Sequence, residues 1–581
     1  MNSRVVLRVV VALLALAGIA LALQRLEALG AGVDVTRHHV GAIPVTAFTP
    51  RGGRAPRSVV VIAHGFAGSQ QLMQPYALAL ARRGYLALTF DFPGHGRNAV
   101  PMAGGLVDFA ASTQALLKAL GEVATAARTW PGGDGRLALL GHSMASDIVI
   151  RRAMADPAVR ATVVLSAYSP VVTASSPRNL LVVDGALEPR MLHDEGLRIV
   201  SLALGGATAE AGRTYGDFAR GTARRFALAE GVEHISVLYS AAAQREAIDW
   251  IDRGLGAPPV APGPPYVDAR GGWLALLYLG LVALAWPLSA LLPRALVASR
   301  DAGRAVARAG RLDPVTGRHR EEEPLELPSM SALDVGIATP AVRVAPASAT
   351  LATNPWGEVH GAREAAAHGT LGWRGLWPVA VLPAIATPLL LWRVPGGFLP
   401  ILLGDYLLLH FAVYGMLTAL GLWLSRPRRV PLRAVRPLAL GVAALAATLY
   451  AVFAIGLPLD RYLTSFAPTG QRGPLVLAVF AGALPYFLAD EWLVRGASHA
   501  RGAYAFTKLL FLVSIALAIA LNPERLFFLA IVTPVILLAF VIYGLFSRWV
   551  FHSIGHPWAG ALANAAAFAW LIAVTFPVVS P

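Results

Sequence analysis

The chain has 581 residues and a formal net charge of +15, with 56% hydrophobic residues, 14% charged residues and no cysteine. Soluble domains carry about 25% charged residues, so this composition indicates a membrane protein with an attached soluble part. The arginines gather at the ends of apolar runs rather than on one soluble face, so we expect no nucleic acid partner, and the missing thiols exclude disulfides and a cysteine nucleophile.

Residues 1–24 contain an apolar segment that follows Arg4 and Arg8. Counted over 5–23, the segment nearly reaches the length needed to span a bilayer, which favours an uncleaved signal anchor. The alternative is a signal peptide that is cut after the Ala-Leu-Ala sequence at 20–22. In either case, the domain that follows is exported.

Residues 33–256 alternate between strand-like and helix-like segments. We expect strands at 33–40, 43–48, 58–63, 85–90, 137–140, 161–165, 180–183 and 225–228. Helices are expected at 70–83, 106–128, 146–154, 189–203 and 235–253. This alternation predicts an α/β fold with a mostly parallel sheet that is covered by helices on both faces.

The strand expected at 137–140 leads into the motif Gly-His-Ser-Met-Ala at 141–145, and a helix-like segment follows at once. This context is typical of a nucleophile elbow, which presents a serine hydroxyl above an α/β sheet. A tight turn of this kind requires small neighbours, and Gly141 provides one. Ala145 stands where the usual G-x-S-x-G pattern has a second glycine. Ser143 is therefore the candidate nucleophile.

Further motifs accompany this elbow in a fixed order. His-Gly-Phe at 64–66 follows the first buried strand, and a D-x-x-G-H-G turn at 91–96 follows the next one. Gly-Ala-Leu-Glu at 185–188 follows a later strand, and His234 precedes the last helix. In this order the motifs resemble the α/β-hydrolase superfamily, and within it the serine hydrolases of the dienelactone hydrolase and esterase kind. The resemblance covers about residues 35–255.

The resemblance implies a catalytic triad. Ser143 would be the nucleophile, His234 the base that takes its proton, and Glu188 the acid that holds the second ring nitrogen. We choose Glu188 because it lies three residues past Gly185, in the position of the family's acid loop. Asp184 is the alternative acid, and its other interpretation is a residue that caps the end of a strand. An imidazole with an ordinary pKa of about 6.5 suits proton transfer near neutral pH.

The oxyanion of the reaction would be held by the backbone N–H groups of Phe66 and Met144, each worth about 3 kcal/mol. His64 and His95 are expected to order their turns rather than to transfer protons. Only about residues 166–178 separate two neighbouring strands, which is too short for a lid. We therefore expect an open site, suited to amphipathic esters, thioesters or short acylated peptides.

The rest of the chain is apolar over lengths that can span a membrane. A Pro-rich linker is expected at 257–270, one span at 273–293, a partly disordered cytoplasmic loop at 294–372, and a domain of about seven helices at 373–581. The apolar stretches lie at 273–292, 377–391, 398–424, 437–457, 474–494, 505–521, 525–546 and 558–578.

Three connecting segments are rich in arginine, at 294–320, 425–436 and 495–501. The positive-inside rule predicts that all three are cytoplasmic. Counting the spans back from them puts residues 25–270 on the outer side, in agreement with the basic residues that precede the first span. We therefore expect a multi-pass protein of a bacterial-type inner membrane whose hydrolase domain is periplasmic.

The seven-helix region carries a second, partial resemblance. Glu491 and Arg495 match the E-E-x-x-x-R-G motif of the CAAX prenyl protease-type intramembrane endopeptidases, and the stretch 556–564 is similar to the last motif of that family. The last motif lacks its histidine, and 513–522 contains no histidine for the middle motif. Over about 370–578 the resemblance thus implies a degenerate relative without a metal site.

The first functional hypothesis is a membrane-anchored serine hydrolase that cleaves a carboxylic ester, thioester or related acyl bond through an acyl-enzyme. Neither a cofactor nor a metal is expected. One alternative is a catalytically inactive, hydrolase-like binding module on a transporter or receptor, and another is a metal-dependent intramembrane protease. The expected partners are a small-molecule or amphipathic acyl substrate and the lipid bilayer, with a possible homo-oligomer through the transmembrane helices.

Overall fold

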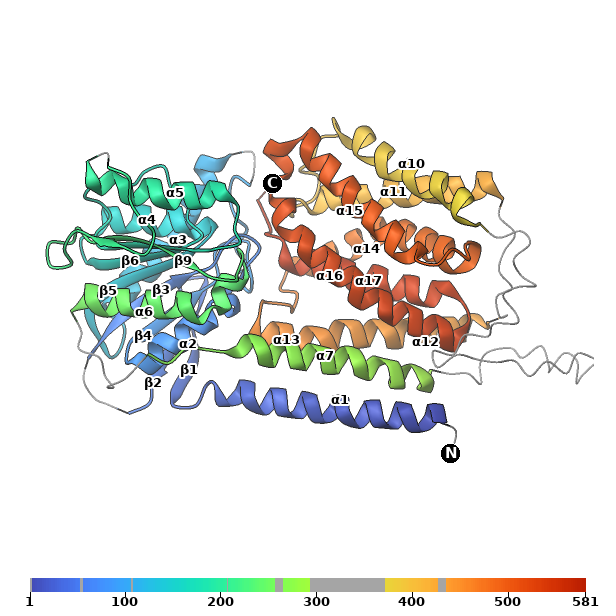
Figure 1. Ribbon diagram of the computed structural model, residues 1–581, viewed down its shortest axis with the longest axis horizontal. Helices are drawn as coiled ribbons and strands as arrows, with labels where there is room; N and C mark the ends of the chain where they lie inside the picture. The colour runs from blue at the N-terminus through green and yellow to red at the C-terminus, as the bar shows by residue number, and fades with distance from the viewer. Residues whose placement is uncertain are drawn as a thin grey trace, which may run out of the picture.

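The computed structural model describes residues 3–52, 56–105, 108–205, 207–256, 265–292, 371–426 and 435–580. An α/β domain lies at one end of a bundle of long helices, and the helices run side by side away from it (Figure 1). The Pro-rich residues 257–264 of the expected linker lie outside the described residues. So does nearly all of the loop expected at 294–372.

In the described part of the chain, nine strands form one mixed sheet. The strands are β1 Val33–Val40, β2 Ile43–Pro50, β3 Arg57–Ala63, β4 Leu86–Phe90, β5 Gly133–His142, β6 Val159–Leu165, β7 Leu180–Gly185, β8 Thr214–Tyr215 and β9 Arg224–Ala229. Their order is β1-β2-β4-β3-β5-β6-β7-β9-β8. The strands from β4 to β9 in this order run parallel, whereas β1, β2 and β8 pair antiparallel at the two edges.

Helices cover the sheet on both faces. They are α2 Gln74–Arg83, α3 Phe109–Arg128, α4 Met144–Ala155, α5 Arg190–Ser201 and α6 Ala241–Leu255, and α3, α4 and α5 lie opposite α2 and α6 (Figure 1). Successive residues of β3 enter two different cores: Val59 and Val61 pack on one face, and Val60 and Ile62 on the other. Burial of both faces is typical of parallel sheets. The predicted α/β fold is confirmed.

The remaining long helices are apolar. They are α1 Ser3–Ala28, α7 Arg270–Leu288, α10 Trp373–Leu391, α11 Gly404–Ser425, α12 Pro437–Leu449, α13 Ile455–Tyr462, α14 Arg472–Glu491, α15 Ala503–Leu521, α16 Pro523–Ile554 and α17 Pro557–Thr575. Within the described ranges, nine helical segments are long and apolar enough to cross a membrane, with α12 and α13 counted as one. These segments are compatible with a multi-pass membrane protein.

Helix α1 packs along α7 at both of its ends. The guanidinium group of Arg8 lies 5.5 Å from the ring of Trp286, and that of Arg25 lies 5.6 Å from the ring of Trp273. Cations over indole rings are attracted to the ring quadrupole. The first apolar segment of the chain is therefore part of the bundle.

One helix begins later than the sequence predicts. The apolar stretch 398–424 is helical only from residue 404, and Leu403 has a φ of 63°. The N–H of Leu402 donates to the carbonyl of Pro577 at 2.9 Å. The prediction is wrong over the first residues of the stretch because their backbone pairs with the C-terminal segment instead of forming a helical turn.

The α/β domain contacts the bundle through loops at the carboxyl ends of its parallel strands. In the loop after β4, the carbonyl of Gly94 accepts hydrogen bonds from Val578 N at 2.8 Å and from Arg472 Nη2 at 2.7 Å. A Cβ atom at Gly94 would overlap the carbonyl oxygen of Val578, so this approach requires glycine. The buried Arg472 also donates to the carbonyls of Ala573 and Phe576. One side chain thus joins the loop, α14 and α17.

A second contact between the two parts centres on Asp460 in α13. Its carboxylate accepts a hydrogen bond from Arg97 Nη2 at 2.7 Å, and its backbone carbonyl accepts one from Gln71 Nε2 at 3.2 Å. Nearby, Ser465 N donates to Ser69 Oγ at 2.9 Å. The loops after β3 and β4 therefore both rest on the bundle.

Arg472→Ala tests this docking. The substitution removes the donor of the Ala573 and Phe576 carbonyls, whereas Gly94 keeps its bond from Val578 N, and each buried unsatisfied group costs about 1–3 kcal/mol. We expect the midpoint of thermal unfolding of the purified protein to fall by about 5 °C or more. Arg461→Ala is the matched control, since this exposed arginine pairs with Glu27 and an exposed pair contributes about 1 kcal/mol or less. Equal shifts for both variants would contradict the assignment.

Candidate active site

Ser143 lies at the turn between β5 and α4, with a φ of 54° and a ψ of −117°. Such a conformation costs a residue other than glycine about 1–3 kcal/mol, so the surrounding packing must hold it. Gly141 makes this packing possible, because a Cβ atom there would lie 2.7 Å from Ala145 O and 2.8 Å from Val149 Cγ2. Ala145 is itself fully buried, so its methyl group is accommodated in the core. The geometry is that of a nucleophile elbow.

His234 lies in the loop after β9 and contacts this elbow. Its Nε2 atom is 2.9 Å from Ser143 Oγ, a hydrogen-bond distance. The side chain of His234 is 19% exposed, and Ser143 is half-buried, so solvent or a substrate can reach the pair. A ring nitrogen in direct contact with a serine hydroxyl is placed to accept its proton.

Glu188 approaches the other nitrogen of the same ring. Its side chain is fully buried, and Oε1 lies 3.7 Å from His234 Nδ1. This separation is longer than a hydrogen bond, but within the range at which a carboxylate favours a positive charge on the ring. Ser166 Oγ donates to the same carboxylate oxygen at 2.5 Å and fixes its position. The structure therefore brings Ser143, His234 and Glu188 together.

Asp184, the alternative acid, is fully buried at the end of β7. One of its carboxyl oxygens lies 3.4 Å from Ala167 N, and the other has no hydrogen-bond partner among the described residues. Burial and, after it, the negative charge of Glu188 raise the pKa of Asp184 to about 8. Asp184 is therefore protonated at neutral pH, whereas the acid of a triad acts as an ionised carboxylate. Position and charge both favour Glu188 as the partner of His234.

Buried histidines order the turns around this group. His142 Nε2 donates to the backbone carbonyl of His234 at 2.9 Å and so ties down the loop that carries the candidate base. His64 donates from Nδ1 to the carbonyl of Gly65 at 2.8 Å. Burial lowers the pKa of His142 and His95 to about 3, and it also lowers the pKa of His64. A ring with a lowered pKa is a weak proton acceptor, and His234 is the histidine that lies at hydrogen-bond distance from Ser143 Oγ.

The loop after β3 lies directly against the serine. A Cβ atom at Gly65 would sit 3.0 Å from Ser143 Cβ, so the backbone just before Phe66 passes beside the nucleophile. Met144 opens α4 immediately after the serine. That the N–H groups of Phe66 and Met144 hold an oxyanion stays a prediction.

The side chain of Phe66 makes a contact that sequence reasoning missed. Its ring centroid lies 4.5 Å from that of Phe528 in the second turn of α16, and 6.4 Å from that of Phe576. In the sequence, the one feature that could have pointed to this contact is the aromatic pair Phe527 and Phe528 at the start of an apolar stretch. A helix of the bundle therefore borders the candidate site.

The polar residues of the second resemblance form ion pairs. Glu491 pairs with Arg495 and accepts a hydrogen bond from Ser547 Oγ at 2.5 Å. Asp490 pairs with Lys508 on the neighbouring helix. Over the ranges that the structure describes, no group of three or more His, Asp or Glu side chains is placed to hold a metal ion. Kinship with the prenyl proteases stays a prediction.

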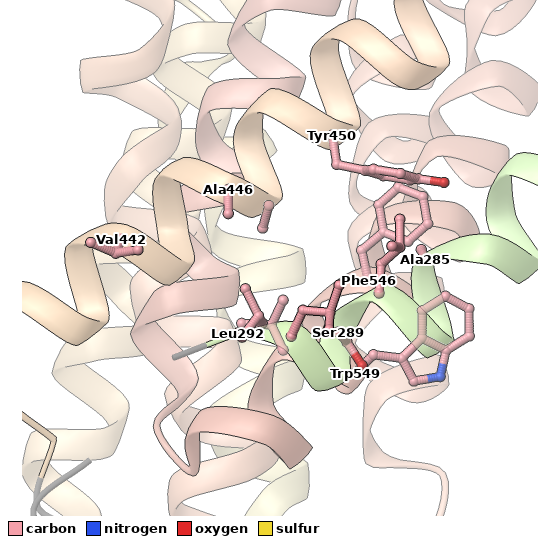
Figure 2. Close-up of a pocket in the computed structure, with 12 residues that line it drawn as sticks. Ala285, Ser289, Leu292, Val442, Ala446, Tyr450, Phe546 and Trp549 are labelled. Carbon is pink, nitrogen blue, oxygen red and sulfur yellow. The ribbon is translucent and has the colours of Figure 1, made fainter. Parts of the chain in front are cut away.

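A cavity of about 350 Å³ lies within the bundle, between α7, α12 and α16 (Figure 2). Its walls are mostly apolar and include Val442, Phe546 and Trp549, with Tyr450 along one side. All of its lining residues belong to the bundle, so this cavity is separate from the group around Ser143.

Comparison with known proteins finds similarity for the α/β domain. Residues 54–187 match a family model described as serine aminopeptidase, S33. A solved structure from Thermus thermophilus is 19% identical, with a TM-score of 0.29, and the match covers 39% of this chain and 99% of that one. A CIB-like hydrolase from Thermoplasma acidophilum is 17% identical, with a TM-score of 0.30, and covers 39% and 100% of the two chains. A search of curated proteins finds no match.

The family match spans the loop after β3, the elbow at Ser143 and most of the acid loop. With the mostly parallel sheet, it identifies the domain as a member of the α/β-hydrolase superfamily. The protein is thus a hydrolase of α/β type that is joined to a bundle of long apolar helices.

Asp184→Asn tests the charge state of the second buried acid. Between about pH 4 and 8 the unfolded chain releases the Asp184 proton while the folded chain keeps it, so rising pH favours unfolding of the wild type. Asparagine has no such proton. We therefore expect the unfolding midpoint of the variant, relative to wild type, to rise across this window and level off above pH 8.

The midpoint is measured by thermal unfolding in detergent at a series of pH values. Asp194→Asn serves as the control, because this carboxylate lies on the exposed face of α5 in the same domain. Its difference from wild type should vary little with pH. A pH-independent difference for Asp184→Asn would show that Asp184 is ionised in the folded protein.

Proposed function

We propose that the protein is a membrane-anchored serine hydrolase that cleaves a carboxylic ester, thioester or related acyl bond. The observation that carries this proposal is the hydrogen bond between Ser143 and His234, made at a strained elbow with Glu188 buried behind the imidazole. A module that only binds ligands has no need of this strain, which argues against the inactive alternative.

The reaction begins when His234 Nε2 takes the hydroxyl proton while Ser143 Oγ bonds to the acyl carbon. The electron pair of the carbonyl moves to its oxygen, and the N–H groups of Phe66 and Met144 stabilise that oxyanion by about 3 kcal/mol each. The intermediate then collapses, and the leaving group departs with the proton from His234. Water, deprotonated by the same histidine, releases the acid and restores the serine. In both halves Glu188 stabilises the imidazolium.

The loop geometry supports a substrate that enters from an open side. Only residues 166–179 connect β6 to β7, the place where a lid would otherwise be inserted. An open site of this kind accepts small-molecule or amphipathic acyl substrates, and the same acyl transfer can also cleave a peptide bond.

We further propose that the hydrolase domain lies outside the cytoplasm of a bacterial-type cell, on the inner membrane. Helices α11 and α14 begin beside the hydrolase domain and therefore end at the opposite end of the bundle (Figure 1). In the sequence, the arginine-rich segments at 425–436 and 495–501 come where these helices end. Arginine-rich segments stay in the cytoplasm, which supports the outer position of the hydrolase.

Labelling of the purified protein with a fluorophosphonate probe tests the catalytic assignment. The wild type should be labelled, and Ser143→Ala should not, because the probe bonds only to an activated serine. His234→Ala and Glu188→Gln should slow labelling, the former by about 10³-fold or more. Ser201→Ala on α5 is the serine control and should label normally. Failure of folded wild-type protein to react would remove the proposed activity.

Single cysteines test the orientation, since the natural chain has none and gives no background. Val35→Cys is exposed on the outermost strand of the sheet, and Ser425→Cys is exposed at the end of α11. A membrane-impermeant maleimide applied to intact spheroplasts should label the first variant and not the second. After permeabilisation both should react. The reverse pattern would place the hydrolase domain in the cytoplasm.

A further inference from the structure

Phe66, Phe528 and Phe576 form an aromatic wall where the hydrolase domain meets the bundle. The ring of Phe66 contacts that of Phe528, with the centroids 4.5 Å apart, and the ring of Phe576 lies 6.4 Å from that of Phe66. Phe576 is buried, but Phe66 and Phe528 are only half-buried, so the wall keeps an accessible face. Because Phe66 directly follows Gly65, which lies against Ser143, the wall begins beside the nucleophile.

An apolar stripe on α16 leads from this wall along the bundle. Phe527, Pro534, Leu538 and Val541 are exposed, and their spacings of seven, four and three residues put them on one face of the helix. The ring of Phe527 lies 6.0 Å from that of Phe528. Since α16 is long and apolar enough to cross a membrane, this face contacts lipid in a bilayer.

The contact between Phe527 and Phe528 joins the stripe to the wall, and Gly65 joins the wall to the backbone beside Ser143. A substrate dissolved in water can reach Ser143 without contacting these apolar side chains. A substrate anchored in the bilayer has to move its acyl carbon out of the hydrocarbon region while its chain stays in apolar surroundings, because each methylene kept out of water stabilises the bound state. The aromatic wall meets that need.

We propose that the aromatic wall binds the acyl chain of a membrane-resident ester, a bilayer lipid or lipid-like amphiphile, and that this contact presents the ester carbonyl to Ser143. The inference rests on the proposed serine hydrolase activity and adds the substrate class. It also makes Phe528 a specificity-determining residue of the hydrolase that is supplied by the membrane-spanning part of the chain.

The test uses full-length protein in lipid nanodiscs with two chromogenic substrates, p-nitrophenyl acetate and p-nitrophenyl decanoate. Phe528→Ala removes the ring that the longer chain would contact. We expect the kcat/KM of the decanoate ester relative to that of the acetate ester to fall about tenfold, mainly through a higher KM. Phe528→Leu, which restores an apolar side chain, should recover most of this preference.

Phe453→Ala is the matched control. Phe453 is a second phenylalanine of the bundle with an accessible ring, but this ring packs near Trp570 rather than Phe66, so the variant should keep the wild-type preference. Equal losses on both esters in Phe528→Ala, or the same preference in all the variants, would overturn the acyl-chain site. Fluorophosphonate labelling of Ser143 in the same samples separates the two proposals, because an unreactive wild type would overturn the activity itself.

Discussion

The strained backbone at Ser143 is the constraint on which the rest of the structure depends. A residue with a φ of 54° keeps that conformation only if its neighbours leave no alternative. Here α4 packs against Gly141, the loop at Gly65 packs against the side chain of Ser143, and the ring of His234 lies at hydrogen-bond distance from its hydroxyl. All of these groups follow the carboxyl ends of parallel strands and therefore lie at the same edge of the sheet. Each loop that holds the serine therefore also carries part of the proposed catalytic group, and the same edge makes the contact with the bundle.

Burial organises the charges around this edge. Burial and, after it, the negative charge of Glu188 raise the pKa of Asp184, so this buried pocket does not hold two ionised carboxylates that would repel each other. Burial also lowers the pKa of His142. Its ring is therefore neutral and donates a hydrogen bond to the backbone carbonyl of His234. The groups nearest the imidazole thus position it without competing with it for protons.

Much of this arrangement could be predicted from the sequence, because it is encoded locally. Apolar runs such as 58–63 identify the buried strands, and short motifs that follow strands predict which side chains meet at Ser143. Three features could not be predicted in this way. Strand β8 has two residues, which is too short for a periodic pattern. Residues 398–403 are not helical, because their backbone pairs with the C-terminal segment. The ring of Phe66 contacts that of Phe528, which lies more than 400 positions further along the chain. Each of these depends on tertiary contacts that no local pattern records.

The hydrogen bonds between Gly94 and Val578, and between Met102 and Ser580, have a consequence for biogenesis. In the latter pair the partners are 478 residues apart, so the loop after β4 is synthesised long before the segment that completes its bonding. Contacts of such separation form late, because a long loop must close before they give any stability. The α/β domain can build its sheet early, but the edge that carries Ser143 and His234 reaches its final form only once α17 has packed against it. Assembly of the helical bundle thereby becomes the last step in forming the candidate active site.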